Sequence, residues 1–380
     1  MYSLALLVCS YLALHVTQDV SRVDGAEDST QLWHDFKIKY GKVYEDEETE
    51  NQRRANFERN LARIEDFKRE SAIVMSQNGT SNATAFESFT IGVNALSDLS
   101  DEEFSVMNGV KMPTVSKGII RWFLDKLNLF KNEVYDFDEA RSFRFIQKIL
   151  DSPGEVPDAL DWRQVAGAVT PVKDQGKCGS CWAFAATGVL EGQRRIRHPR
   201  SKRIFKQIDL SQQNLVDCDK WNNGCDGGNI VNAFGYIKRM GGVNDAHSYP
   251  YRAEKGRCRF RPENVIISDK GAAVLPYGHE EILKHVVAKY GPVAASIDAS
   301  DPFRSYGGGI YEKKDCRRED YGDYGHGVLI VGYGTDKHGR DYWIVKNSWS
   351  KFWGEDGYAR IARNRGNMCG IATSPNIAIL

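Results

Sequence analysis

The chain has 380 residues, with 51 basic and 51 acidic side chains and therefore no formal net charge at neutral pH. This length exceeds one typical domain and allows a large hydrophobic core. The basic side chains are dispersed rather than gathered into a block or stripe, so we expect no nucleic-acid partner.

The first apolar run, residues 4–16, has the length of a signal-peptide core and is too short to span a bilayer. We therefore predict a signal peptide over residues 1–18; a buried N-terminal helix is the alternative. No later run reaches transmembrane length, so we expect a soluble mature protein without membrane contact.

The segment from about residue 31 to residue 70 is charged, and its apolar residues recur at helical spacing. The polar stretch that follows contains two N-glycosylation sequons, at Asn78 and Asn82. Apolar residues between 119 and 130 predict one further helix. For that helix we favour a packed insertion over a membrane-binding element.

Charge is divided unevenly along the chain. Residues 19–154 carry 18 basic and 25 acidic side chains, a balance of −7, and residues 155–380 carry 33 and 26, a balance of +7. One interpretation is two independently solvated surfaces. The other, which we favour, is an acidic segment that docks on a basic domain.

Seven cysteines remain once the predicted signal peptide has taken Cys9 with it. An odd number in a secreted protein indicates one unpaired thiol, and the other six allow 15 pairings. The pair Cys178 and Cys181 has the spacing of half a zinc ribbon, but no second pair of that spacing follows, so we predict no metal site.

The sequence Cys178-Gly-Ser-Cys181-Trp182 matches the local signature of the papain and cathepsin nucleophile. His326 and Asn347 follow it by 145 and 166 residues, in the order that this signature requires. The chain thus resembles the papain family of cysteine proteases, the cathepsin L-like branch in particular. The resemblance implies an α+β fold in which a helical domain and a barrel-like antiparallel sheet domain enclose a cleft, with no cofactor.

The resemblance also implies the role of each catalytic residue. Cys181 is the nucleophile, and it acts as a thiolate favoured by a helix N-terminus and by an imidazolium at His326. Asn347 orients that ring, and Trp349 shields their hydrogen bond from water. Gln175 and the backbone N–H of Cys181 stabilise the oxyanion, although a loop glutamine is more often merely solvated.

Gly227 and Gly228 resemble the glycine wall on which the substrate backbone lies, with ordinary turn glycines as the alternative. Trp349 belongs to the same binding surface. The resemblance places the side-chain pocket at Ile230, Ser296, Tyr324 and Ser374. It pairs the cysteines as Cys178–Cys225, Cys218–Cys258 and Cys316–Cys369. Because none of the pocket residues is acidic, we expect an apolar substrate side chain in that pocket.

Two motifs upstream resemble cathepsin L-like propeptides. Arg53, Phe57, Asn60 and Ile64 match the central part of the ERFNIN helix, and residues 92–98 match the short motif that follows it. We therefore predict an inhibitory propeptide over residues 19–154 and a peptidase domain over residues 155–380. The whole is expected to be a monomeric endopeptidase zymogen, secreted or lysosomal, that acts on proteins or peptides.

Activation is expected by cleavage near residues 153–157, after acid near pH 4–5.5 has weakened the ion pairs that hold the propeptide. The rival from another class is a catalytically inactive papain-like binding protein. Inactive proteins of that class usually lack the catalytic cysteine, histidine or glutamine, and this chain keeps all three. Release of the N-terminal half as a free inhibitor is compatible with the main hypothesis.

Overall fold

The computed structural model describes residues 25–77, 89–111, 138–197, 208–318 and 325–380. Several predicted features lie outside these residues: the signal peptide, the sequons at Asn78 and Asn82, the helix at 119–130, and Tyr324.

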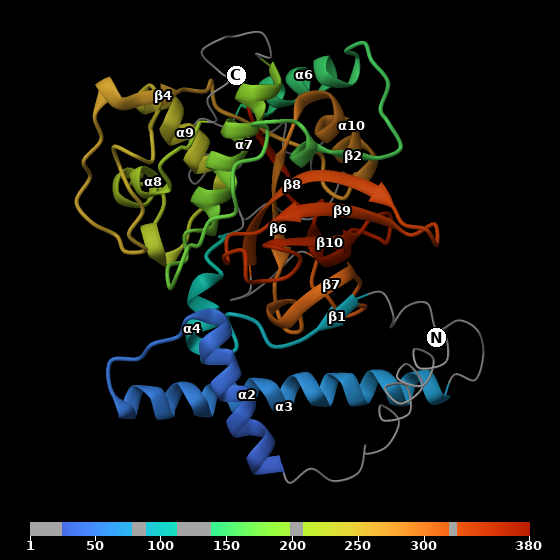
Figure 1. Cartoon of the computed structure of the whole chain (residues 1–380). Coiled ribbons are helices and arrows are strands. Elements are labelled where there is room, and N and C mark those ends of the chain that lie inside the picture. Colours follow the sequence, from blue (N-terminus) through green and yellow to red (C-terminus); the bar gives the residue numbers. More distant parts are fainter. Residues whose placement is uncertain (1–24, 78–88, 112–137, 198–207, 319–324) are drawn as a thin grey trace, which may run out of the picture.

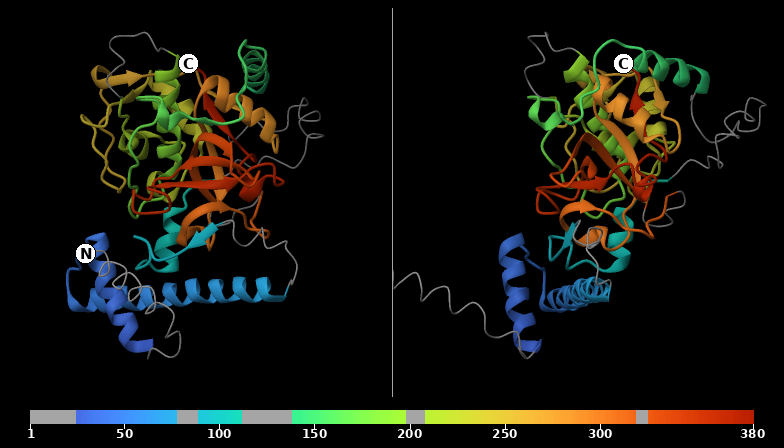
Figure 2. Two further views of the ribbon diagram at one scale, coloured as in Figure 1. Left: turned by 45° about the vertical axis from the view of Figure 1, so that its right-hand side comes forward. Right: turned by 90° about the vertical axis from the view of Figure 1, so that its right-hand side faces the viewer.

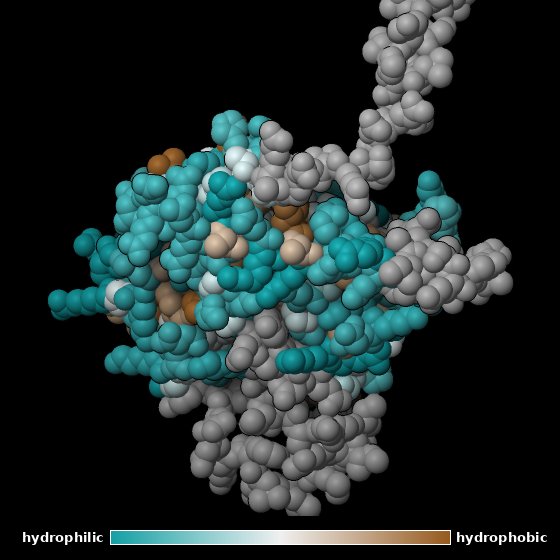
Figure 3. All heavy atoms as spheres, turned by 90° about the horizontal axis from the view of Figure 1, so that it is seen from below, coloured by the Kyte–Doolittle hydropathy of each residue, from teal (hydrophilic) through white to brown (hydrophobic). Residues whose placement is uncertain are grey.

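Two long helices form the N-terminal part, below the rest of the molecule in Figure 1. Helix α2 spans Gly25–Tyr40 and α3 spans Glu47–Gln77. They are separate helices because the chain turns at Gly41, whose φ of 61° is left-handed and suits glycine. Trp33, Phe36 and Phe57 pack where the two helices meet. Seen from this side, the described surface is mostly hydrophilic (Figure 3), as expected for helices that turn their apolar residues inward.

The residues of the two upstream motifs hold this part together. Asn60 donates from its Nδ2 to the carbonyls of Ser97 and Leu99, at 2.8 and 3.0 Å. Arg53 binds both carboxylate oxygens of Glu103, at 2.5 and 2.6 Å. Glu103 in turn completes a capping box with Ser100 that begins the short helix α4, Asp101–Met107. The motifs thereby fix the direction in which the chain leaves α4.

A helical domain follows. Its central helix α7 spans Cys181–Arg197, and α8 and α9 span Gln212–Cys218 and Ile230–Met240. Alanine and glycine at many positions of α7 let neighbouring elements approach closely, and the helix is buried along most of its length. Two short strands, β3 at Val243–Asn244 and β4 at Val265–Ile267, pair at the edge of this domain.

The sheet domain is built from β2 and β5–β11. These strands are Leu160–Asp161, Ala272–Val274, Val293–Asp298, Tyr306–Tyr311, Gly325–Thr335, Asp341–Lys346, Tyr358–Ala362 and Asn376–Ala378. Helix α10, Glu280–Tyr290, covers one side. Within the described residues the sheet has nine strands in the order β1-β7-β10-β9-β8-β6-β11-β5, with β2 paired to β8. The ninth strand is β1, Phe89–Ile91, from the N-terminal part.

Helix α7 packs against β8, so the two domains share a boundary along which the cleft can form. The three disulfides are Cys178–Cys225, Cys218–Cys258 and Cys316–Cys369, the pairs that the resemblance implied. Among the described cysteines this leaves one free thiol, at Cys181.

One element was not expected from the sequence. Helix α6, Glu139–Leu150, lies between the N-terminal part and the helical domain in the sequence, but it packs on α10 and β5. Figures 1 and 2 place it at the opposite end of the molecule from α2 and α3.

Candidate active site

Cys181 is the first residue of α7, and its side chain is fully buried. Its position at the helix N-terminus follows from the sequence, because Cys178 is tied to Cys225 and the chain then enters the helix at once. The backbone of Gly327 in β8 contacts the thiol, so the thiol faces the strand that carries His326.

His326 lies in β8 and Asn347 directly follows β9. The Nε2 of His326 lies 2.7 Å from Oδ1 of Asn347. The ring of Trp349 covers this pair, with its centroid 4.3 Å from that of the imidazole. Since strands β8 and β9 pair side by side, the sheet itself sets the distance between the histidine and the asparagine.

Gln175 is fully buried. Its Nε2 donates to the carbonyls of Cys178 and Met107, each at 2.8 Å. The hydroxyl of Ser348 donates to its Oε1 at 2.7 Å and so fixes which end of the amide points into the cleft. The sequence analysis missed this role of Ser348, although the residue stands between the predicted Asn347 and Trp349.

The end of the N-terminal part fills the cleft. Gly228 donates its N–H to the carbonyl of Gly109 at 2.7 Å and accepts from the N–H of Lys111 at 3.0 Å. On the other wall, Val110 donates to the carbonyl of Gly325 at 3.0 Å. A Cβ at Gly109 would lie 1.9 Å from the carbonyl oxygen of Gly179, so only glycine fits at this point of the segment. We call residues 25–111 the inhibitory segment.

Burial shifts the pKa values of Cys181 and His326. It raises the pKa of the Cys181 thiol, an effect that contacts from Gly327 and Gly109 oppose. It also lowers the pKa of His326 to about 4, although Asn347 and Met107 act in the other direction. The covered site therefore favours neutral thiol and neutral imidazole.

Charged contacts hold the inhibitory segment beside the cleft. Lys177 donates to Glu103 at 2.8 Å, and Arg304 lies 3.2 Å from Asp101. The Arg304 guanidinium also donates to the carbonyls of Leu96 and Leu99 and stacks over the ring of Phe104, 4.8 Å from its centroid. An acidic segment thus docks on basic side chains, the interpretation of the charge split that we favoured. Nothing in the local sequence marks Arg304, which becomes visible only through its contacts.

Two family models match the chain: the papain family cysteine protease model over residues 156–379 and the cathepsin propeptide inhibitor domain model over residues 33–104. The chain belongs to the papain family. A cathepsin L-like peptidase of Aedes aegypti is 41% identical over 345 residues, which is 90% of each chain. Procathepsin L of Rattus norvegicus is 39% identical, over 92% of this chain and 91% of the relative.

Solved structures agree with this assignment. The digestive procathepsin L2 proteinase of Tenebrio molitor matches with a TM-score of 0.73 at 35% identity, over 93% of this chain and 100% of that one. This chain is accordingly a cathepsin L-like cysteine protease with its own propeptide inhibitor domain, and its fold is the papain-like α+β fold.

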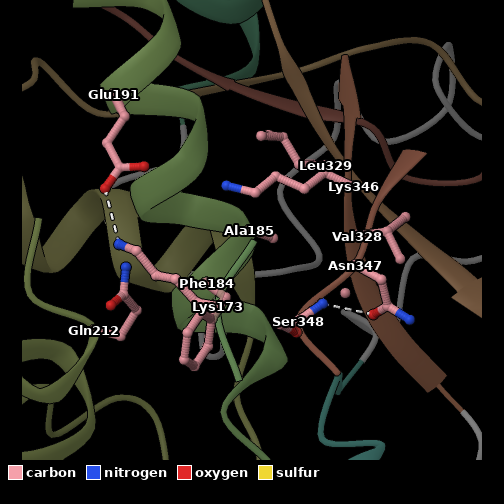
Figure 4. A pocket seen from close by; sticks show the side chains of 11 residues that line it. Lys173, Phe184, Ala185, Glu191, Gln212, Val328, Leu329, Lys346, Asn347 and Ser348 are labelled. Atoms are coloured by element: carbon pink, nitrogen blue, oxygen red, sulfur yellow. Dashed lines mark hydrogen bonds and ion pairs between the residues drawn. The ribbon is translucent and has the colours of Figure 1, made fainter. Parts of the chain in front are cut away.

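A small pocket lies beside Asn347 and Ser348, between α7 and the sheet (Figure 4). Lys173 binds Glu191 of α7 at 3.2 Å on one side, and Lys346 reaches towards α7 from the strand side. Thr170 joins them, because it donates to Glu191 at 2.6 Å and accepts from Lys346 at 2.9 Å. Burial lowers the pKa of Lys346 to about 8, against the attraction of Glu191. This network links the helix of Cys181 to the residue before Asn347.

The predicted side-chain pocket is only partly visible. Ile230 begins α9, Ser296 lies in β6 opposite Gly327, and Ser374 precedes β11; all three are buried. Gly227 has a φ of 100°, which favours glycine, and a Cβ there would lie 2.5 Å from the carbonyl oxygen of Gly109. Among the described residues, no cluster of potential metal ligands occurs and no helix has the length and apolarity to cross a membrane.

Proposed function

We propose that Cys181, His326, Asn347 and Gln175 form the catalytic group of a cysteine endopeptidase made as a zymogen. The observation that supports this most strongly is the hydrogen bond from the side-chain amide of Gln175 to the Met107 carbonyl. A peptide carbonyl is held there by the donor that the hypothesis assigns to the oxyanion, in the cleft that contains the one free thiol of the described residues.

The reaction then has three steps. The Cys181 thiolate attacks the substrate carbonyl carbon, and the negative charge that develops on the oxygen is stabilised by Nε2 of Gln175 and the N–H of Cys181. The His326 imidazolium gives its proton to the departing amine. It then accepts a proton from water, which attacks the acyl-enzyme and releases the carboxylic acid and the thiolate.

Substrate is proposed to lie along Gly227 and Gly228. Gly228 already exchanges two backbone hydrogen bonds with the inhibitory segment, which supports its capacity to bind an extended peptide. Ile230, Ser296, Tyr324 and Ser374 are proposed to form the pocket for an apolar side chain, with Trp349 at the edge of the site.

We propose cleavage near residues 153–157, giving a propeptide of residues 19–154 and a peptidase domain of residues 155–380. Residues 153–155 are exposed and lie in neither helix nor strand, as a processing site requires.

Three disulfides suit a protein that folds in an oxidising compartment. We propose the secretory pathway, with a signal peptide at residues 1–18, glycans at Asn78 and Asn82, and a lysosomal or extracellular destination. A monomer with protein or peptide substrates, without nucleic-acid or membrane partners, remains our expectation.

Replacement of the nucleophile tests the assignment. Cys181→Ala should abolish hydrolysis of peptide substrates by the activated enzyme while the fold, followed by circular dichroism, stays intact. Cys181→Ser is the conservative companion and should be almost as inactive, because a hydroxyl is far less acidic than a thiol. Turnover by purified Cys181→Ala at the level of the unchanged enzyme would contradict the proposal.

A further inference from the structure

Helix α6 is seated on the peptidase domain by apolar side chains. Ile146 and Ile149 are 5% and 6% exposed and belong to the same core cluster as Leu283 and Val286 of α10. Phe145 of α6 lies edge-on against Tyr290, with ring centroids 5.3 Å apart and planes at 89°. The core of the sheet domain therefore extends across the proposed processing site into α6.

The backbone of the sheet also depends on α6. Strand β5 is the last strand at this end of the sheet and pairs with β11. The hydroxyl of Ser142 donates to the carbonyl of Val274 at 3.2 Å and accepts from its N–H at 3.0 Å. One side chain of α6 thus satisfies both polar groups of this edge residue. A bare edge of this kind would be open to pairing with another chain.

The C-terminal end of α6 is held by a lysine of the peptidase domain. Nζ of Lys289 donates to the carbonyls of Leu150 and Ser152, at 3.0 and 2.7 Å. Terminal carbonyls of a helix have no partner within the helix, and a cation placed there also favours the helix dipole. This anchor lies before residue 153, so cleavage at 153–157 would leave it in place.

The contacts of α6 differ from those of the inhibitory segment in how strongly a fall in pH weakens them. Apolar side chains and hydroxyls do not titrate, and a lysine ammonium stays charged throughout the acid range. The carboxylates near α6 bear on this as well. Asp269 beside it has a pKa raised by burial to about 8 and is neutral in acid, while Asp138 and Asp151 cap the helix itself. Glu139 is the first residue of α6 and Glu280 is the first residue of α10. Glu281 of α10 lies 3.5 Å from His285 of the same helix.

From this geometry we propose that α6 is a lasting part of the mature protease. The surface formed by β5 and α10 is a binding site for residues 138–152 of the same chain, independent of the cleft. When a cut between residues 111 and 138 lets the inhibitory segment leave, α6 stays, either still joined to the peptidase domain or held without a covalent bond after a second cleavage at 153–157.

The test uses enzyme activated from the full chain at pH 4.5. The active fraction is isolated by gel filtration at pH 4.5 and at pH 7.5, and its polypeptides are identified by mass spectrometry under denaturing conditions. We expect a polypeptide that contains residues 138–152, in an amount equal to that of the peptidase domain, at both pH values. Active enzyme that begins near residue 155 and carries no such polypeptide would overturn it.

Matched variants of α6 distinguish specific binding of residues 138–152 to the peptidase domain from their non-specific presence in the active fraction. Ile146→Asp, on the buried face, should lose residues 138–152 from the active fraction, whereas Gln147→Asp, one position along on the exposed face, should keep them. If Ile146→Asp does not accumulate, Ser142→Ala replaces it and should reduce retention several-fold. Equal retention in the buried-face and exposed-face variants would count against the proposal. Peptide hydrolysis measured in the same fractions tests the proposed function separately.

Discussion

The inhibitory segment and α6 both precede the peptidase domain, and each covers one end of the same sheet. Strand β1 of the inhibitory segment pairs with β7 at one end, and α6 covers β5 at the other. Their contacts differ. The inhibitory segment combines apolar anchors with charged ones, such as Glu103 to Lys177, whereas α6 is held by isoleucines, a hydroxyl and a lysine.

This difference indicates which of the two sets of contacts can be reversed. A carboxylate contact weakens when the carboxylate binds a proton. The backbone hydrogen bonds in the cleft are lost when a larger residue replaces a glycine there. The burial of the isoleucine side chains of α6 responds to neither change. The inhibitory segment precedes α6 in the sequence, yet the physical chemistry of their contacts suits the first for release and the second for retention.

The largest expected effect comes from breaking the inhibitory contact where it is tightest. Gly109→Ala places a Cβ 1.9 Å from a backbone oxygen, which cannot move aside, so residues 107–111 must leave the cleft. Loss of three or four hydrogen bonds of about 1 kcal/mol each should raise the rate of Cys181 alkylation in the uncleaved proenzyme about 10²–10³-fold. The rate is measured at pH 7.5 with a thiol reagent.

Gly92→Ala is the matched control for this variant. It makes the same change in the same segment, but a Cβ there meets nothing within 4 Å. Its alkylation rate should equal that of the unchanged proenzyme. A similar rate for both variants would mean that the fit at Gly109 does not control access to the thiol.

A smaller effect should follow from the ion pair between the segment and the peptidase domain. Burial would raise the pKa of Glu103, but hydrogen bonds from Arg53 and Lys177 outweigh it and bring the pKa to about 2. Arg53 lies in the same segment as Glu103, so only the part of this shift that comes from Lys177 stabilises docking. That stabilisation is present above the pKa of the undocked segment and is lost as pH falls from there towards 2. Glu103 in the docked segment therefore stays ionised throughout the expected pH 4–5.5 window.

Glu103→Gln should therefore raise the alkylation rate of the proenzyme about tenfold at pH 7.5, and the ratio to the unchanged proenzyme should shrink below pH 4.5. The neighbouring Glu102→Gln, at an exposed position, should change the rate little. A ratio that stays constant from pH 7.5 to pH 3 would show that protonation of Glu103 has no part in release.

The smallest effect is expected from a substitution within the peptidase domain, which involves neither the inhibitory segment nor α6. Ser350 has a φ of 64°, in the left-handed region that favours glycine. Ser350→Gly should relieve about 1 kcal/mol of backbone strain, partly offset by the greater freedom of glycine in the unfolded chain. Thermal unfolding should shift up by a few degrees at most, with the alkylation rate of the proenzyme unchanged. A lower unfolding temperature would mean that the bond from the N–H of Phe352 to the Ser350 hydroxyl matters more than the strain.

Much of the site could be predicted from the sequence because its residues stand in short motifs. Cys181, His326 and Asn347 each carry local neighbours that mark them, and the disulfides followed from the family resemblance. Arg304, Ser348 and α6 could not be predicted in this way. Arg304 acts through carbonyls and a ring that only the fold brings near, and the apolar face of α6 has meaning only against α10. The burial of Cys181 and His326 could not be predicted either, because it depends on residues that lie far from both in the sequence.

Gln175 has a consequence for how such a protease can change during evolution. Its one amide holds the Met107 carbonyl in the latent enzyme and is proposed to hold the oxyanion in the active one. If Gln175 has this role, a substitution of Gln175 that loosened the inhibitor would damage the chemistry as well. Latency can be changed with less harm to catalysis at residues that contact only the other side, such as Gly109 and Glu103 of the inhibitory segment or Lys177 of the peptidase domain.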